Sequence, residues 1–271
     1  MKAKKKKKVL FISQEIFPYL PESELAVQSR YLSQAVQERG KDTRTFMPKF
    51  GLVNERRNQL HEVIRLSGMN LIINDTDHQL IIKVASIQSA RLQVYFIDNE
   101  DYFQRKNTIA DDSGVEYDDN DERTIFFVRG VLETVKKLRW TPDVIHCQGW
   151  MTALAPLYIK KAYNEDPFFK NSKVVYSLFN DEFKKPFPKE FANNLLMEGV
   201  EPSHLTSLQG DKIDYEALSK LAIDYSDGVI QASETAKQSL IDYAKEKKVE
   251  FLPFVGGEDY ADDYLEFYEK L

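Results

Sequence analysis

The chain opens with a strand, an amphipathic helix, a glycine and a second strand, and no other feature constrains its fold as much as this order. Residues 9–13 form a short apolar run rich in β-forming side chains, which predicts a buried strand. Ser23 is placed to cap a helix that continues to Arg39, and Gly40 follows as a C-terminal glycine does. Residues 42–47 predict a second strand. Because strand–helix–strand units place both strands parallel in one sheet, we predict an α/β fold.

The same alternation continues along the chain. Further buried strands are predicted at residues 144–147, 174–178 and 228–231. Helices are predicted at residues 121–138, 151–164, 214–225 and 233–247, the last one capped by Ser233. Together these elements indicate a Rossmann-like, doubly wound and mostly parallel sheet.

One stretch departs from this alternation. Short apolar runs separated by polar turns occur at residues 63–66, 71–73, 80–84 and 92–97. They predict a β-hairpin insertion at about residues 60–92, whose antiparallel strands lead into a strand that returns to the main sheet. The acidic segment 107–122 is predicted to be a surface loop, and the proline-containing segment 180–210 is predicted to be irregular.

The last residues form a separate unit in the sequence. We divide the chain into a domain at residues 1–255 and an acidic, aromatic helix at residues 256–271, because Gly256 and Gly257 break the pattern. Aromatic and apolar residues then recur at helical spacing among mostly acidic positions: Tyr260, Tyr264, Phe267, Tyr268 and Leu271. Such a helix docks on its own domain more often than on a partner protein, and both interpretations are kept.

Charge and composition exclude several classes of protein. The 271 residues carry 37 Lys and Arg against 43 Asp and Glu, a net charge of −6, which argues against a dedicated nucleic-acid-binding protein. The basic run Lys4–Lys8 is interpreted as a solvated tail, although it could contact phosphates. Cys147 is the single cysteine, so no intrachain disulfide forms, and a cytoplasmic location is expected. No apolar run reaches the roughly 18 residues of a membrane span, and the apolar stretch after the first lysines is too short for a secretory leader.

The common nucleotide and metal motifs are absent. The chain has no G-x-G-x-x-G, no G-x-x-x-x-G-K-[ST] and no H-E-x-x-H. Its four histidines and Cys147 show no metal-ligand spacing. We therefore predict neither a cofactor nor a metal ion.

Several local patterns are nevertheless similar to one family, the bacterial glycogen synthases and plant starch synthases. They follow one another in the same order over about residues 7–240, and the stretch at 140–152, Trp-Thr-Pro-Asp-Val-Ile-His-Cys-Gln-Gly-Trp-Met-Thr, resembles the family most closely. The other similar stretches are 8–19, 94–105, 119–133 and 220–233.

This resemblance implies the GT-B architecture, in which two Rossmann-like domains face each other across a cleft. It also implies retaining transfer of glucose from ADP- or UDP-glucose to an α-1,4-glucan. The chain matches the N-terminal half of that fold, and the residues after 250 are too few for the second, donor-binding domain. We therefore expect a separate donor-domain chain or a regulatory protein as partner.

The family's substrate contacts carry over to a few positions. The resemblance implies substrate binding by Asn120, Arg123, Trp150 and Lys220. Each residue also has a structural explanation: Trp150 packs in the core, Asn120 caps its helix, Arg123 neutralises the acidic loop, and Lys220 is solvated.

At the family's substrate-contacting motifs, this sequence departs from the family pattern at more positions than it matches. Its nucleotide-contacting K-T-G-G loop is replaced by Pro21, Glu22, Ser23 and Glu24, which remove a donor and add carboxylates. Its H-D-W-H-T becomes Gln148, Gly149, Trp150, Met151 and Thr152, so Met151 replaces the histidine that the family places against the transferred sugar. Its H-N pair reads Phe179-Asn180.

No catalytic residue is predicted from these positions. We expect a glycogen/starch-synthase-like domain that does not turn over nucleotide sugar as an isolated chain. The alternative is a non-catalytic module that binds α-glucan or regulates a partner. Nucleic-acid binding rests only on the N-terminal lysines and is the weakest hypothesis.

Overall fold

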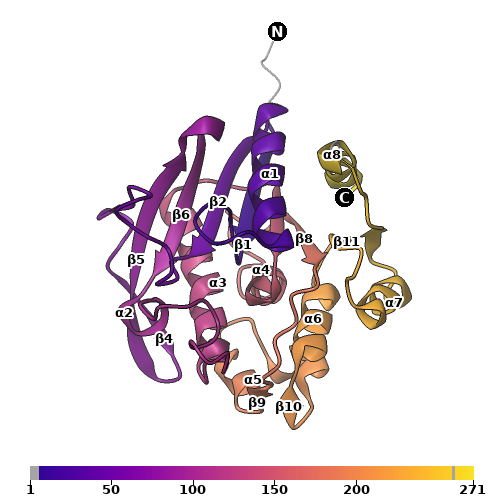
Figure 1. Cartoon of the computed structure of the whole chain (residues 1–271). Coiled ribbons are helices and arrows are strands. Elements are labelled where there is room, and N and C mark those ends of the chain that lie inside the picture. The colour runs from indigo at the N-terminus through magenta and orange to yellow at the C-terminus, as the bar shows by residue number, and fades with distance from the viewer. Residues whose placement is uncertain (1–5, 258–259) are drawn as a thin grey trace.

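A mixed, mostly parallel sheet forms the centre of the protein. The computed structural model describes residues 6–257 and 260–271 (Figure 1), so Lys4 and Lys5 of the basic run lie outside the described residues. The strands that run parallel to one another are β1 (Lys8–Ser13), β2 (Asp42–Pro48), β6 (Leu92–Asp98), β7 (Val144–Gln148), β8 (Lys173–Leu178), β11 (Gly228–Gln231) and β12 (Glu250–Leu252). The antiparallel edge consists of β3 (His61–Glu62), β4 (Met69–Ile73) and β5 (Thr76–Ile87).

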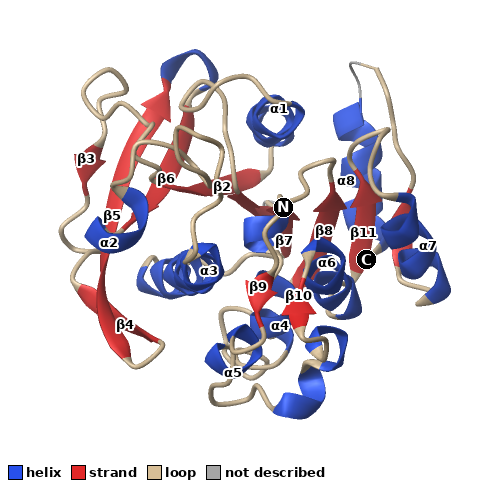
Figure 2. Cartoon of the chain, turned by 60° about the horizontal axis from the view of Figure 1, so that its bottom comes forward, coloured by secondary structure: helices blue, strands red, loops and turns tan. Residues whose placement is uncertain are grey.

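Helices cover both faces of this sheet (Figure 2). The α-helices are α1 (Glu24–Glu38), α2 (Glu100–Phe103), α3 (Asn120–Lys137), α4 (Ala155–Lys160), α5 (Phe191–Asn194), α6 (Tyr215–Asp224), α7 (Gln238–Glu246) and α8 (Tyr260–Lys270). Short 3-10 turns are η1 (Gln88–Ala90), η2 (Trp150–Thr152), η3 (Pro202–His204) and η4 (Thr206–Leu208), and a small ladder joins β9 (Phe187–Pro188) to β10 (Lys212–Ile213).

The order of the strands confirms the predicted doubly wound fold. The main path runs β12-β11-β8-β7-β1-β2-β6-β5-β3. From β1 the chain adds β2 and β6 on one side and later β7, β8, β11 and β12 on the other. The direction of winding therefore reverses between β1 and β7, which is where ligands bind in open α/β sheets.

The central strand β1 shows why its sequence is a continuous apolar run. Successive side chains of a strand point to opposite faces of the sheet. Val9 and Phe11 pack with α1 and α8 on one face, whereas Leu10 and Ile12 belong to the larger core beneath α3, α4 and α6. Both faces are covered, so both sets of side chains are apolar.

The C-terminal helix α8 packs on the same sheet as α1. Tyr264, Phe267 and Tyr268 are buried beside Val9 and Phe11. The Tyr268 hydroxyl lies 2.6 Å from Nδ1 of His146 in β7, and the Ser177 hydroxyl lies 2.6 Å from Nε2 of the same ring. Burial lowers the pKa of His146 to about 3, so the ring is neutral. The domain boundary at residues 255–256 stays a prediction, and residues 258–259 of the predicted tail lie outside the described part.

Most predicted elements form at their expected places, including the Ser23 cap, whose hydroxyl accepts the Ala26 N–H at 3.0 Å. Ser233 does not cap a helix, because its hydroxyl accepts the Thr235 N–H in a turn and α7 begins only at Gln238. A second prediction, that of a strand at residues 63–66, is also wrong.

The predictions at residues 63–66 and 151–164 are corrected as follows. Residues 63–66 form a turn in which the Leu66 N–H donates to the Val63 carbonyl, and Ile64 is 83% exposed, so the strand is β3 just before them. The helix predicted at residues 151–164 is divided. The Thr152 hydroxyl donates to the Gly149 carbonyl in η2, and Pro156 at the start of α4 provides no N–H for a continuous helix.

Candidate functional site

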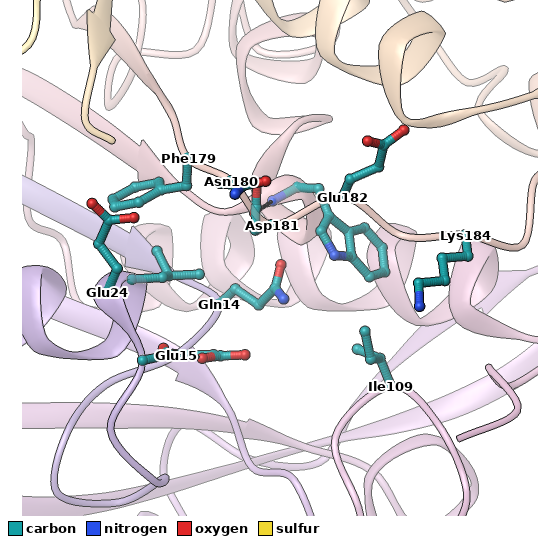
Figure 3. Close-up of a pocket in the computed structure, with 12 residues that line it drawn as sticks. Gln14, Glu15, Glu24, Ile109, Phe179, Asn180, Asp181, Glu182 and Lys184 are labelled. Carbon is teal, nitrogen blue, oxygen red and sulfur yellow. Dashed lines mark hydrogen bonds between the residues drawn. The ribbon is translucent and has the colours of Figure 1, made fainter. Parts of the chain in front are cut away.

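A cavity of about 510 Å³ opens where the winding of the sheet reverses (Figure 3). Its walls are built from the loops at the carboxyl ends of β1, β7 and β8, the start of α1, and Ile109. The lining residues are Gln14, Glu15, Ser23, Glu24, Leu25, Ile109, Trp150, Phe179, Asn180, Asp181, Glu182 and Lys184. This is the position that the doubly wound topology favours for a ligand.

The wall of this cavity is acidic. Glu15 and Glu24 lie on one side of it, and Lys184 lies on the opposite side (Figure 3). Asp181 and Glu182 add further carboxyl groups, and Lys184 is the single basic residue among the described lining residues. Burial raises the pKa of Glu15, against the lowering effect of the Ser23 hydroxyl that donates to it at 2.7 Å. The cavity therefore favours uncharged or positively charged groups over anions.

Asp181 joins two turns of the site. Its Oδ2 accepts the backbone N–H of Trp150 at 2.8 Å, and its Oδ1 accepts the hydroxyl of Tyr215 at 2.9 Å. Burial raises the pKa of Asp181 to about 6, although both hydrogen bonds favour the charged form. Asp181 therefore acts as an acceptor that holds the loop after β7 against the loop after β8.

The turn after β7 is closely packed against the end of β1. Gly149 has a φ of +90°, and a Cβ there would lie 2.7 Å from the Gln14 Cβ. The Gln14 side-chain oxygen accepts the Met151 N–H at 3.0 Å, and the Gln148 oxygen accepts the Ser13 hydroxyl at 2.9 Å. Met151 and Gln148 are buried, so this turn is a packed support of the cavity.

Gly149→Ala should lower the free energy of unfolding by about 2 kcal/mol, since it combines an unfavourable φ with overpacking. Gly40→Ala is the matched control, because Gly40 also has a positive φ of +83° and a Cβ there would meet no atom within 4 Å. We expect a smaller loss for Gly40→Ala, about 1 kcal/mol. Urea denaturation measures both, and equal losses would show that the contact with Gln14 contributes nothing.

Trp150 is buried among aromatic side chains. Its ring centroid lies 4.9 Å from that of Phe183 and 5.9 Å from that of Phe187, and the residue is 0% exposed. Its Nε1–H has no hydrogen-bond partner among the described residues. Trp150 borders the cavity as a core residue, and its role in substrate binding stays a prediction.

Asn120 and Arg123 lie behind the cavity wall. The Asn120 amide donates to the Ile109 carbonyl at 2.8 Å, and Nη1 of Arg123 donates to the Asn120 oxygen at 2.6 Å. Arg123 is fully buried, and its Nε donates to the Tyr102 carbonyl at 2.8 Å. Neither residue lines the cavity, but together they fix Ile109, which does.

The structural explanations given above for Asn120 and Arg123 are both wrong. Asn120 does not cap α3, because the N-cap residue is Asp119 and the Asn120 side chain binds Ile109 and Arg123. Arg123 is not a surface group of the acidic loop. Burial lowers its pKa to about 10.

Lys220 and part of the replaced loop lie outside the cavity lining. Lys220 is on α6, where it pairs with Glu216 at 3.5 Å and lies 5.4 Å from the Tyr243 ring centroid. Ser23 and Glu24 line the cavity, whereas Pro21 and Glu22 are exposed and do not. Substrate binding by Lys220 stays a prediction.

The most consequential residues that the sequence did not indicate are Glu15 and Asp181. Each follows a buried parallel strand by a few residues, at the edge of the sheet where α/β proteins bind ligands. Their position after a predicted strand could therefore have indicated them from the sequence. The side-chain contacts of Asp181 with Trp150 and Tyr215 were not available, because they join residues 31 and 34 positions apart.

Two further observations concern what the described residues lack. They contain no group of three or more His, Cys, Asp or Glu side chains able to hold a metal ion. None of the helices in this part of the chain is long and apolar enough to cross a membrane. The expected cytoplasmic location stays a prediction.

Comparison with known proteins identifies the family. The model of the starch synthase catalytic domain matches residues 8–252. The chain belongs to the starch synthase catalytic-domain family. The predicted resemblance to glycogen and starch synthases is thereby confirmed, and with it membership of a glycosyltransferase family.

Glycogen synthases are among the curated relatives of this starch synthase family member. The glycogen synthase of Chlorobium phaeobacteroides is 34% identical over 257 residues, which are 88% of this chain and 52% of the relative. That of Chlorobium limicola is 37% identical over 207 residues, 73% of this chain and 42% of the relative. The chain spans about half the length of the curated relatives it matches.

A solved starch synthase structure has the same fold. The catalytic domain of Starch Synthase IV from Arabidopsis thaliana, bound to ADP and acarbose, superposes with a TM-score of 0.74 at 18% identity. The match covers 94% of this chain and 52% of that one. This likeness supports the predicted GT-B-type α/β domain.

Proposed function

We propose that this domain does not transfer glucose by itself and that its cavity receives an α-glucan rather than the diphosphate of ADP- or UDP-glucose. The observation that carries this proposal is the acidic lining, in which Glu15, Glu24, Asp181 and Glu182 face a single lysine. Glucan hydroxyls donate hydrogen bonds to carboxylates and accept them from Asn180 and Lys184, so a neutral saccharide suits this mixture of groups.

A diphosphate meets the opposite conditions at the start of α1. Anions bind at helix N-termini through free N–H groups. Here the Ser23 hydroxyl already accepts the Ala26 N–H, and Pro21 has no N–H to offer. Each carboxylate within about 4 Å of a phosphate oxygen adds about 1 kcal/mol of repulsion even in water, and more in a less polar cavity.

The residues of the turn after β7 support the absence of transfer. The family resemblance implies a histidine at the position of Met151, against the transferred sugar. A methionine side chain neither carries a proton nor donates a strong hydrogen bond. Met151 is also fully buried, so a substrate in the cavity has no access to its side chain.

Within this proposal the sugar nucleotide is bound outside this domain. Glucose incorporation into glycogen should be absent with these 271 residues alone and should appear when cell extract supplies a donor-binding domain. Absence in both cases would remove the enzyme-subunit interpretation and leave glucan binding.

A regulatory module that docks through its C-terminal tail has weaker support. The aromatic side chains of α8 are buried against the sheet. Glu269 pairs with Lys41 at 2.9 Å and Lys7 at 3.3 Å, and Asp262 pairs with Arg39. These contacts leave little of the tail's aromatic surface for a partner.

Affinity electrophoresis in glycogen gels, with calorimetry for ADP-glucose, tests the proposal. We expect retardation by glycogen and no measurable heat with ADP-glucose. Glu24→Gln should weaken glycogen binding about tenfold, since it removes a charge-assisted hydrogen bond. Glu198→Gln, which changes an exposed carboxylate outside the cavity, is the matched control. Unaltered mobility of the wild-type chain, or tight ADP-glucose binding, would contradict the proposal.

A further inference from the structure

A small hairpin from the acidic loop reaches the loop that follows β8. The Asp111 N–H donates to the Val115 carbonyl at 2.9 Å, and the Tyr117 N–H donates to the Ile109 carbonyl at 3.0 Å. An antiparallel bridge pairs Ala110 with Glu116. Residues 109–117 therefore form an ordered hairpin whose first residue lines the cavity.

Glu116 of this hairpin binds two successive backbone N–H groups. The Lys184 N–H lies 2.9 Å from Oε1 and 3.1 Å from Oε2 of Glu116, and the Lys185 N–H donates to Oε2 at 2.7 Å. Successive N–H groups that converge on one anion form the kind of concave site in which proteins bind phosphate. In this structure the bound anion is a carboxylate of the chain itself.

The two lysine side chains add positive charge at the same place. Nζ of Lys184 makes no ion pair within residues 6–257 and 260–271, and it lies on the cavity wall (Figure 3). Nζ of Lys185 pairs with Asp118, which belongs to the same acidic segment as Glu116. The two carboxylates that neutralise this basic loop, Glu116 and Asp118, thus lie two positions apart in the same acidic segment.

We propose that the backbone and side chains of Lys184 and Lys185 form a binding site for a phosphate-type oxyanion, which Glu116 occupies and masks. Displacement of the hairpin leaves two N–H donors and the Lys185 ammonium without their carboxylates, next to the Lys184 ammonium. A phosphate in their place gains charge-assisted hydrogen bonds from all of these groups. The site lies on the wall opposite Glu15 and Glu24, and it does not depend on glucan binding.

Titration of the full chain with inorganic phosphate, followed by the backbone amide signals in NMR, tests this site. We expect Glu116→Ala to bind phosphate at least tenfold more tightly than the wild-type chain, because the competing carboxylate is gone. The amide signals of Lys184 and Lys185 should shift most. Asp112→Ala is the matched control, since it removes an exposed carboxylate of the same hairpin that pairs with Lys106.

Two outcomes would overturn the proposal: equal phosphate affinity of wild type and Glu116→Ala, or shifts confined to other residues. Glu116→Gln keeps the size of the side chain, so it gives the same test if the alanine variant loses the hairpin. Adding Lys184→Ala to either variant should return the affinity to the wild-type level. Glycogen-gel mobility of the single variants Glu116→Ala and Glu116→Gln separates this site from glucan binding, because Glu116 does not line the cavity and we expect their mobility to be unchanged.

Discussion

Arg123→Ala should lower the free energy of unfolding by about 3 kcal/mol. The cavity and the lost hydrogen bonds destabilise the variant, and removal of a buried charge offsets part of that loss. Arg123 is fully buried, and its removal leaves the Asn120 oxygen without its donor and the Tyr102 carbonyl with only the longer hydrogen bond from Arg105, at 3.4 Å. Its guanidinium carbon also lies 5.2 Å from the ring centroid of Phe103 and 5.3 Å from that of Tyr117. Chemical denaturation at neutral pH measures the loss.

Two further variants separate the causes of that loss. Arg123→Met refills most of the volume and leaves only the lost hydrogen bonds to Asn120 and Tyr102, so we expect about half of the effect. Lys220→Ala removes another family-matched residue from an exposed ion pair and should cost less than about 0.5 kcal/mol. A loss of glucan binding by Arg123→Met with unchanged stability would instead show that Arg123 contacts the ligand.

The stability of the protein should fall as the pH rises through about 6, and Asp181 should account for a large part of the fall. The pKa of Asp181 is raised from the usual 3.8 to about 6 in the folded protein, chiefly by burial. The folded state therefore binds a proton between these values that the unfolded state releases. This bound proton contributes about 3 kcal/mol to the free energy of unfolding. The contribution is complete below pH 3.8 and is lost above pH 6.

Asp181→Asn isolates this contribution, because Asp121, whose pKa is also raised to about 6, affects both proteins equally. The Tyr215 hydroxyl also lies 3.1 Å from the Phe179 carbonyl, so it can donate there and accept from the new amide. The difference in unfolding free energy between wild type and variant, measured by urea denaturation from pH 4 to 7, should decrease by about 2 kcal/mol, most of the full contribution. A constant difference would show that Asp181 keeps its ordinary pKa.

The fold could be predicted because its signals are local. The apolar runs of β1, β7 and β8 are continuous, since both faces of the sheet are covered, and the Ser23 cap precedes an amphipathic helix. The errors lie where tertiary contacts override local patterns. Ser233 has the residue type of a cap, but its hydroxyl is used in a turn, and the helix begins five residues later at Gln238.

The candidate site was only partly predictable. Replacement of the family loop indicated an acidic wall, and Ser23 and Glu24 do line the cavity. The second acidic contribution, Asp181, and the contact of Glu116 with Lys184 depend on residues 31 and 68 positions from their partners. No pattern in a single sequence specifies pairs at such separations.

The position of α8 has a consequence for how this protein folds during its synthesis on the ribosome. Helix α8 supplies Tyr264, Phe267 and Tyr268 to the cover over the central strands, and Tyr268 also satisfies the buried His146. During synthesis these strands leave the ribosome long before α8, which covers them. A nascent chain halted before residue 260 would thus expose part of this apolar sheet face to chaperones, and the face is fully covered only after α8 has been synthesised.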